Sequence, residues 1–145
     1  MYVMGVDRVM IATWDLEAVV GQFSDLLGLS FSDVAEPTTD TESGAQEVAN
    51  TISPSGVEIL TPRDDGNEVA RFLEENGPGL YALSIRVADL NQATTELRGK
   101  GVEPVGHYDH DHFAEAFYHP EHFGGAFVIL AEYEAPHPAI TASAG

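Results

Sequence analysis

The sequence predicts an α+β fold in which two repeated β-α-β-β-β units form a cupped mixed sheet with helices on its outer face. The first observation is a repeat, because strand patterns begin near Arg8 and Ala82, helix patterns begin at Asp15 and Asp89, and both pairs have an offset of 74 residues. The second observation is size. With 145 residues, of which 43% are hydrophobic, the chain is long enough for one domain with a buried core.

The first repeat, residues 6–62, begins with an apolar, β-branched strand at 6–13. A helix follows, with Asp15 as N-cap, apolar residues at helical spacing and Gly28 as the stop. We expect a short strand at 29–33 and a polar loop at 36–44. Strands at 47–53 and 56–60, joined by a Ser-Pro-Ser-Gly turn, complete this repeat.

The second repeat, residues 80–134, follows a linker helix at 67–76. It begins with a strand at 80–87 and a helix that starts at Asp89 and ends at Gly99. Further strands are expected at 102–105, 114–118 and 125–132. Residues 1–134 are therefore predicted to form a single domain, and the Ala- and Pro-rich residues 135–145 a disordered tail.

The composition disfavours several classes of partner. There are 24 Asp and Glu residues against 6 Lys and Arg, which gives a net charge of −18 and repels nucleic acid. The absence of Cys excludes disulfides and thiol chemistry. No apolar run approaches the roughly 18 residues that cross a bilayer, and the first residues do not resemble a leader. We expect a cytoplasmic protein without nucleic-acid or membrane partners.

Several short motifs, in order, resemble the vicinal oxygen chelate superfamily, also called the glyoxalase and bleomycin-resistance fold. Within that superfamily the chain most resembles the methylmalonyl-CoA epimerases. The matching stretches are VDRVMIAT at 6–13, DLE at 15–17, VEILTP at 57–62, FLE at 72–74, GPGL at 77–80 and FYHPEHFGG at 117–125. The resemblance spans residues 6–134 and implies a ligand-binding concavity between the two repeats.

The metal ligands of this superfamily are not retained. The resemblance implies two His residues in the first strands of the repeats and two Glu or Gln residues in the last strands. The corresponding residues here are Arg8, Ala82, Glu58 and Ile129, of which Glu58 alone could bind a metal ion. A catalytic divalent ion commonly has three protein ligands. The sequence therefore predicts a metal-independent member of the family without a cofactor.

Strand alternation predicts which side chains face the concavity. If Arg8 faces inward, Met10 shares its face, and Ser84 and Arg86 face inward from the second repeat. Two inward guanidinium groups would favour an anionic or enolate-like ligand. The alternative is that Arg8 forms a structural ion pair with Glu58 and Arg86 reaches solvent at the rim. The residues expected to bind substrate are Met10, Tyr81, Ser84, Arg86, Phe127 and Ile129.

Proton-transferring groups are expected at two other places. The resemblance aligns Glu42 with one of the two catalytic glutamates of the epimerases, although an exposed loop carboxylate is the alternative. His110 and His112 lie in an alternating His/Asp run at 107–112. Such a run is most often a solvated loop, but it can also act in acid–base catalysis or bind a metal. His119 and His122 are expected in a turn outside the concavity.

These observations predict an enzyme that transfers a proton on a small carbonyl or phenolic substrate, as an isomerase, epimerase or lyase. The expected catalytic residues are Arg8, Glu42, Glu58, His110 and His112. The alternatives are a non-catalytic, drug-sequestering protein of the bleomycin-resistance kind and a structural or regulatory module. Six basic residues argue against a coenzyme A thioester as substrate. A homodimer is expected, because relatives with paired units often shield their concavities by association.

The first prediction concerns metal content. We expect the purified protein to contain no stoichiometric divalent ion in the concavity, because Arg8, Ala82 and Ile129 stand where the family has ligands. Elemental analysis of the protein checks this expectation. One zinc, nickel or cobalt ion per chain, together with activity that a chelator removes, would contradict it.

Overall fold

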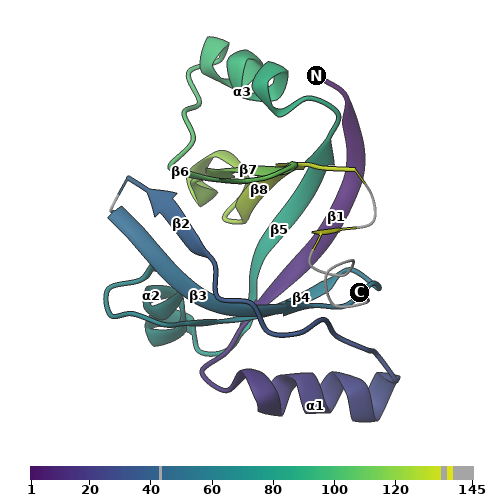
Figure 1. Ribbon diagram of the computed structural model, residues 1–145. Helices are drawn as coiled ribbons and strands as arrows, with labels where there is room; N and C mark the ends of the chain where they lie inside the picture. Colours follow the sequence, from purple (N-terminus) through teal and green to yellow (C-terminus); the bar gives the residue numbers. More distant parts are fainter. Residues whose placement is uncertain (43, 135–136, 139–145) are drawn as a thin grey trace.

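The computed structural model describes residues 1–42, 44–134 and 137–138. Each half of the chain has one strand, then a helix, then three strands (Figure 1). The helical elements are α1 (Leu16–Leu27), α2 (Glu68–Asn76), α3 (Leu90–Gly99) and the 3₁₀ turn η1 (Pro120–His122). The strands are β1 (Val3–Ala12), β2 (Thr38–Thr41), β3 (Gly44–Ile52), β4 (Val57–Pro62), β5 (Gly79–Val87), β6 (Gly106–His110), β7 (Phe113–Tyr118) and β8 (Phe127–Glu132).

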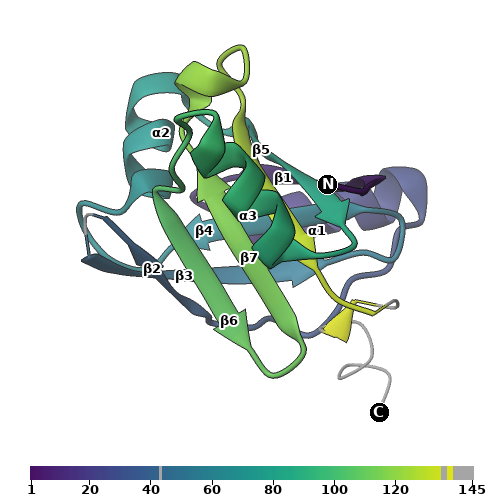
Figure 2. The same ribbon diagram turned by 90° about the horizontal axis from the view of Figure 1, so that it is seen from above.

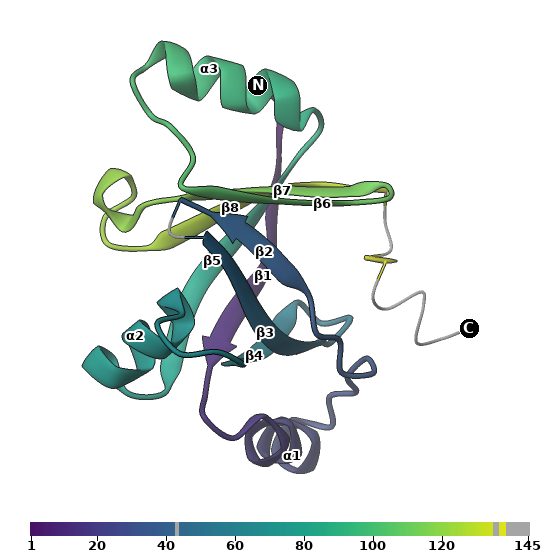
Figure 3. The same ribbon diagram turned by 60° about the vertical axis from the view of Figure 1, so that its left-hand side comes forward.

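The strands close into a barrel in the order β1-β4-β3-β2-β6-β7-β8-β5. The pairs β1/β4 and β5/β8 are parallel, and the other pairs, including β1/β5, are antiparallel. Figure 3 shows α1 and α3 on opposite sides of the barrel, outside the sheet. The α+β class, the mixed sheet and the outer helices are therefore confirmed.

Local sequence signals place the helices. The Asp15 carboxylate accepts a hydrogen bond from the Ala18 amide, and the C-cap residue Gly28 has a φ of 69°, which glycine adopts at low cost. Asp89 caps α3 through the Gln92 amide. None of the helices in the described part of the chain is long and apolar enough to span a membrane.

The two outer helices cover the sheet through separate apolar clusters. Leu16 of α1 packs with Ala49 and Ile59 of β3 and β4. Ala93 of α3 lies in a second cluster with apolar residues of β7 and β8, and Figure 2 shows α3 crossing over this part of the sheet. The barrel interior therefore stays available for a cavity.

Two expectations in the first half were wrong. Residues 29–33 form no strand; the Ser32 amide donates to the Ile52 carbonyl, and the nearby Ala35–Asn50 pair is an isolated bridge. The region predicted as a loop at 36–44 contains β2, which pairs with β3 and β6. β2 forms a hairpin with β3, whereas its pairing with β6 joins distant parts of the chain, for which local sequence carries little signal.

The second half required two similar corrections. Residues 102–105 form no strand, because the Val102 amide donates to the Leu97 carbonyl at the end of α3. The strand lies further on, as β6, inside the His/Asp run that was expected to be a solvated loop. Pairing with β2 and β7 supplies its backbone hydrogen bonds, and a turn at 111–112 follows. The predicted tail at 135–145 lies outside the described residues, apart from His137 and Pro138.

The second prediction tests how β2 and β6 close the barrel. A Cβ added at Gly106 would lie 2.7 Å from the Asp40 carbonyl oxygen on β2, whereas one added at Gly21 in α1 would meet nothing within 4 Å. We expect Gly106→Ala to lower the free energy of unfolding by about 1–3 kcal/mol through overpacking. Gly21→Ala should raise it by up to about 1 kcal/mol, because alanine is the better helix former.

Urea denaturation of both variants measures these changes. A Gly106→Ala variant that is as stable as the wild type would show that the approach of β2 to β6 is not tight.

Candidate functional site

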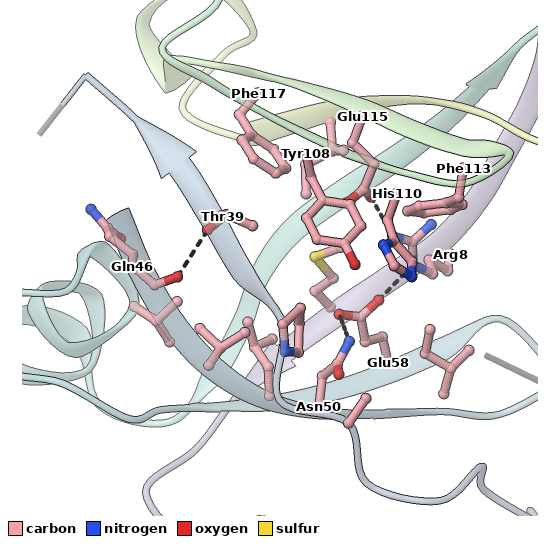
Figure 4. Close-up of a pocket in the computed structure, with 18 of the residues that line it drawn as sticks. Arg8, Thr39, Gln46, Asn50, Glu58, Tyr108, His110, Phe113, Glu115 and Phe117 are labelled. Carbon is pink, nitrogen blue, oxygen red and sulfur yellow. Dashed lines mark hydrogen bonds and ion pairs between the residues drawn. The ribbon is translucent and has the colours of Figure 1, made fainter. Parts of the chain in front are cut away.

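The barrel encloses a cavity of about 590 Å³. Aromatic and aliphatic side chains line most of it, and a charged cluster lies at one place on its wall (Figure 4). The lining includes the following residues of seven strands, α2 and the turn at 111–112: Arg8, Met10, Asn50, Glu58, Glu68, Tyr81, Tyr108, His110, Asp111, His112, Phe113, Glu115, Phe117, Phe127 and Ile129.

Arg8 is the centre of the charged cluster and is only 4% exposed. Its Nε donates to Glu58 Oε1 at 2.5 Å, and its Nη2 donates to Glu115 Oε2 at 2.6 Å. Its Nη1 donates to Asp7 and, at 3.0 Å, to Ser84 Oγ. These contacts use four of the five guanidinium N–H groups, so the cluster is tightly connected.

The strand registers explain why these groups meet. Arg8 pairs with Ser84 across β1/β5, and Glu58 on β4 pairs with Met10, one inward position further along β1. β7 is separated from β1 by β5 and β8, so Glu115 approaches the guanidinium from another wall. The Arg8–Glu58 ion pair, one of the two alternatives for Arg8, is therefore present. Ser84 faces Arg8, but it is fully buried and does not line the cavity where it was expected to bind substrate.

Sequence reasoning missed Glu115. The residue lies between Phe113 and Phe117 in a region predicted to be a strand. Residues two apart in a strand point to the same face, so Glu115 shares its face with both phenylalanines. A carboxylate between two inward aromatic residues was the signal that could have identified it. Glu115 is now a central residue of the site.

Of the two alternatives for the concavity, the one with two inward guanidinium groups and a positive charge was wrong. Three carboxylates, Asp7, Glu58 and Glu115, surround the single guanidinium of Arg8. Arg86 does not line the cavity; its Nη2 donates to the Tyr133 carbonyl at 2.6 Å, and its guanidinium lies 4.5 Å from the Tyr133 ring centroid. The local charge is therefore negative.

Burial controls protonation within the cluster. It raises the pKa of Glu115 to about 7, and the charge of Arg8 opposes this increase only in part. For Arg8, burial lowers the pKa, but the carboxylates of Glu58 and Glu115 outweigh burial and raise it above its ordinary value. Arg8 thus stays charged, while Glu115 changes its protonation state near neutral pH.

Four of the residues expected to bind substrate line the cavity, namely Met10, Tyr81, Phe127 and Ile129. The Tyr81 and Phe127 rings stack with centroids 5.4 Å apart, and Phe127 and Phe117 stack at 6.1 Å. Together these rings form a flat aromatic wall.

The remaining predicted residues are divided between the cavity and the surface. His110 and His112 line the cavity with Asp111, and all three are exposed. Glu42 is exposed and lines a second cavity of about 790 Å³ instead. His119 caps the η1 turn and His122 is its last residue, and both lie outside the 590 Å³ cavity.

The cluster does not fit the divalent ion that the family resemblance implies. Ala82 and Ile129 offer no donor atoms, and the guanidinium of Arg8 already lies among the carboxylates. No group of three or more metal-binding side chains is found in the described ranges.

The third prediction compares Glu115→Gln with the wild type. Because the pKa of Glu115 is raised from 4.5 to about 7, its neutral form is favoured in the folded state. The resulting stabilisation is full below pH 4.5 and is lost as the pH rises through 7. Gln mimics the neutral carboxyl, so both proteins should have similar free energies of unfolding at pH 4.5. At pH 8 the variant should be more stable by about 3 kcal/mol.

Urea denaturation at several pH values measures this difference. His137, whose pKa burial lowers to about 4, has the opposite effect on stability, but both proteins share it. A difference that does not change with pH would show that Glu115 titrates alike in the folded and unfolded states.

Comparison with known proteins places the chain among epimerase relatives. It is 29% identical over 131 residues to the ethylmalonyl-CoA/methylmalonyl-CoA epimerase of Cereibacter sphaeroides, covering 87% of this chain and 96% of that protein. It is 26% identical over 130 residues to the mitochondrial methylmalonyl-CoA epimerase of Dictyostelium discoideum, covering 87% of this chain and 76% of the relative.

Solved structures agree with this relationship. The methylmalonyl-CoA epimerase of Mycobacterium tuberculosis has a TM-score of 0.75 and 28% identity, over 97% of this chain and 93% of that one. A Streptomyces coelicolor epimerase variant shares the fold, with a TM-score of 0.76 at 22% identity over 92% and 99% of the two chains. Residues 7–118 match a family profile. The chain therefore belongs to the Glyoxalase/Bleomycin resistance protein/Dioxygenase superfamily.

Proposed function

We propose that this protein is a metal-independent enzyme that transfers a proton at a carbon next to a carbonyl group, or on a phenolic ring, inside the barrel cavity. The observation that carries the proposal is the placement of Glu58 and Glu115. They come from β4 and β7 and approach Arg8 from opposite sides in Figure 4. Isomerisation and epimerisation both need one group that removes a proton and one that supplies a proton.

The proposed chemistry needs only these two carboxyl groups. One ionised carboxylate takes the proton from the substrate carbon, and the electron pair moves onto the carbonyl oxygen as an enolate. The other carboxyl group, in its protonated form, then returns a proton to carbon. With a pKa of about 7, Glu115 is available in both forms near neutral pH.

Two hydrogen-bond donors fix the Glu58 carboxylate in place. Arg8 Nε donates to its Oε1, and Asn50 Nδ2 donates to its Oε2 at 3.3 Å. Both oxygens are therefore fixed, and the carboxylate is kept at the cavity wall. Such pre-organisation lowers the cost of reaching the reactive geometry.

Arg8 acts in this proposal as a positioning residue. Its contacts to Glu58 and Glu115 fix the two carboxyl groups relative to each other. Most of its N–H groups already donate to these partners, so it suits this role better than that of binding an enolate-like ligand directly. The acid–base role expected for Glu42 passes to Glu115, because Glu42 lies at another cavity.

The substrate is proposed to be smaller than the coenzyme A esters named for the relatives. Arg63, Arg71 and Arg98 form exposed salt bridges with Glu36, Glu68 and Glu103. Within the described residues, Arg8 is the one Arg or Lys that lines the 590 Å³ cavity. A multiply phosphorylated tail would therefore meet few free cations.

The second candidate function is ligand sequestration without catalysis. The flat wall of Tyr81, Phe127 and Phe117 favours it, because stacked rings bind an aromatic ligand whether or not a reaction follows. Proton exchange separates the two functions, since only an enzyme exchanges a carbon-bound proton of the ligand with solvent.

The proposed homodimer has its own support. Tyr2, Val3, Met4 and Val6, at the start of β1, are exposed apolar side chains. β4 pairs with β1 only from Val9 onward, so this half of β1 has an open edge on that side. Exposed apolar surface beside an open edge is typical of an association surface.

The fourth prediction concerns proton exchange in deuterated water. We expect the wild-type protein to incorporate deuterium into the acidic carbon of at least one compound in a panel of small carbonyl and phenolic compounds. Glu115→Gln should lower this rate at least about a hundredfold, because general acid–base groups commonly contribute that much. Mass spectrometry of the recovered compounds measures the incorporation.

The matched control is Glu121→Gln, which changes an exposed carboxylate outside the cavity. It should leave the exchange rate unchanged. If wild-type protein binds compounds of the panel but exchanges none of them at any pH, proton transfer is refuted and sequestration takes its place.

A further inference from the structure

We propose that the barrel cavity selects small aromatic compounds that carry a positive charge, such as an aryl ammonium ion or an N-alkylated heterocycle. This inference names the ligand class for the site of the proposed function. It concerns binding, so it can be measured whether or not the protein catalyses a reaction.

The cavity wall carries more negative than positive groups. Besides Arg8, the lining contains the carboxylates of Glu58, Glu68, Asp111 and Glu115. Arg71 pairs with Glu68 at 3.1 Å and offsets its charge. The excess negative charge therefore comes from Glu58, Glu115 and Asp111, which together exceed the single guanidinium.

The negative charge lies both inside the cavity and at its exposed end. Glu58 and Glu115 are buried, and the attraction between a buried carboxylate and a cation is screened far less than one at the surface. Asp111 lies at the exposed end of the cavity, in the turn after β6. A cation would thus be attracted both at the mouth and inside.

Aromatic rings line much of the cavity. The rings of Tyr81 and Phe127 stack with an interplanar angle of 27°, and those of Phe127 and Phe117 with one of 24°. Tyr108 and Phe113 lie at the wall near Arg8 in Figure 4. Ring faces attract both flat aromatic groups and cations, which are stabilised by the negative face of the ring.

The volume of the cavity and the net charge of the chain also favour a small cation. A volume of about 590 Å³ lies within the range of small-molecule sites and suits a compound with one or two rings. The net charge of −18 attracts cations and repels anions during approach. Local and global charge therefore favour the same ligand class.

The experiment uses three ligands with the same naphthalene ring and different charge. They are 2-naphthylmethyl-trimethylammonium, 2-naphthylmethanol and 2-naphthoate. Calorimetry at pH 8 measures their dissociation constants, because most Glu115 is ionised at that pH. We expect the cation to bind at least about tenfold more tightly than the alcohol, and the anion to bind most weakly.

Asp111→Asn tests whether the cavity charge causes this preference. Asp111 has a φ of 53°, a conformation that asparagine also tolerates, and its side chain is 82% exposed, so the fold should be unaffected. The variant should bind the cation several-fold more weakly and the alcohol unchanged. Glu121→Gln, outside the cavity, should bind all three ligands as the wild type does.

Equal affinities for the three ligands, or tightest binding of the naphthoate, would overturn this inference. So would a preference for the cation that both variants share unchanged with the wild type, since it would then arise from the overall charge. Proton exchange without charge preference refutes the inference alone. Charge preference without proton exchange on any compound refutes only the proposed function.

Discussion

The buried guanidinium of Arg8 is the interaction on which the rest of the site depends. Its N–H groups hold Glu58, Glu115, Asp7 and Ser84, which come from four different strands. Three carboxylates could not remain together in the interior without a cation, because the cost of burying unpaired charge is several kcal/mol per ion. Arg8 therefore joins the walls of the barrel and fixes the geometry of the two candidate acid–base groups.

This chain has the barrel of its relatives but different side chains at the positions that the family resemblance assigns to metal ligands. The barrel is shared with methylmalonyl-CoA epimerases at TM-scores near 0.75. The positions that hold metal ligands according to the family resemblance have become Arg8, Ala82 and Ile129, and a carboxylate from another strand, Glu115, faces the guanidinium instead. Arg8 is the cation within this cluster, and the surrounding carboxylates make the site negative. The fold therefore identifies the family, whereas the side chains determine which ligands the cavity accepts.

The sequence by itself determined the elements that depend on local signals. Asp15 and Asp89 cap helices, Gly28 ends one, and the apolar alternation in β1 places Arg8 and Met10 on the inner face. The repeat of strand and helix starts indicated the fold class before any contact was known. The Arg8–Glu58 ion pair was one of two alternatives that the sequence left open.

The tertiary structure decided everything that depends on pairing between distant segments. β2 and β6 pair with each other and so join the two halves of the chain, a contact that no local pattern in the sequence signals, and both regions were expected to be loops. The negative charge of the site also depends on contacts between distant residues. Glu115 accepts a hydrogen bond from Arg8, 107 residues away in the sequence, and Arg86 donates to the Tyr133 carbonyl and does not line the cavity. A single strand shows by alternation which residues face inward, but the charge of a site is a sum over all the strands that meet there, and only their register determines that sum.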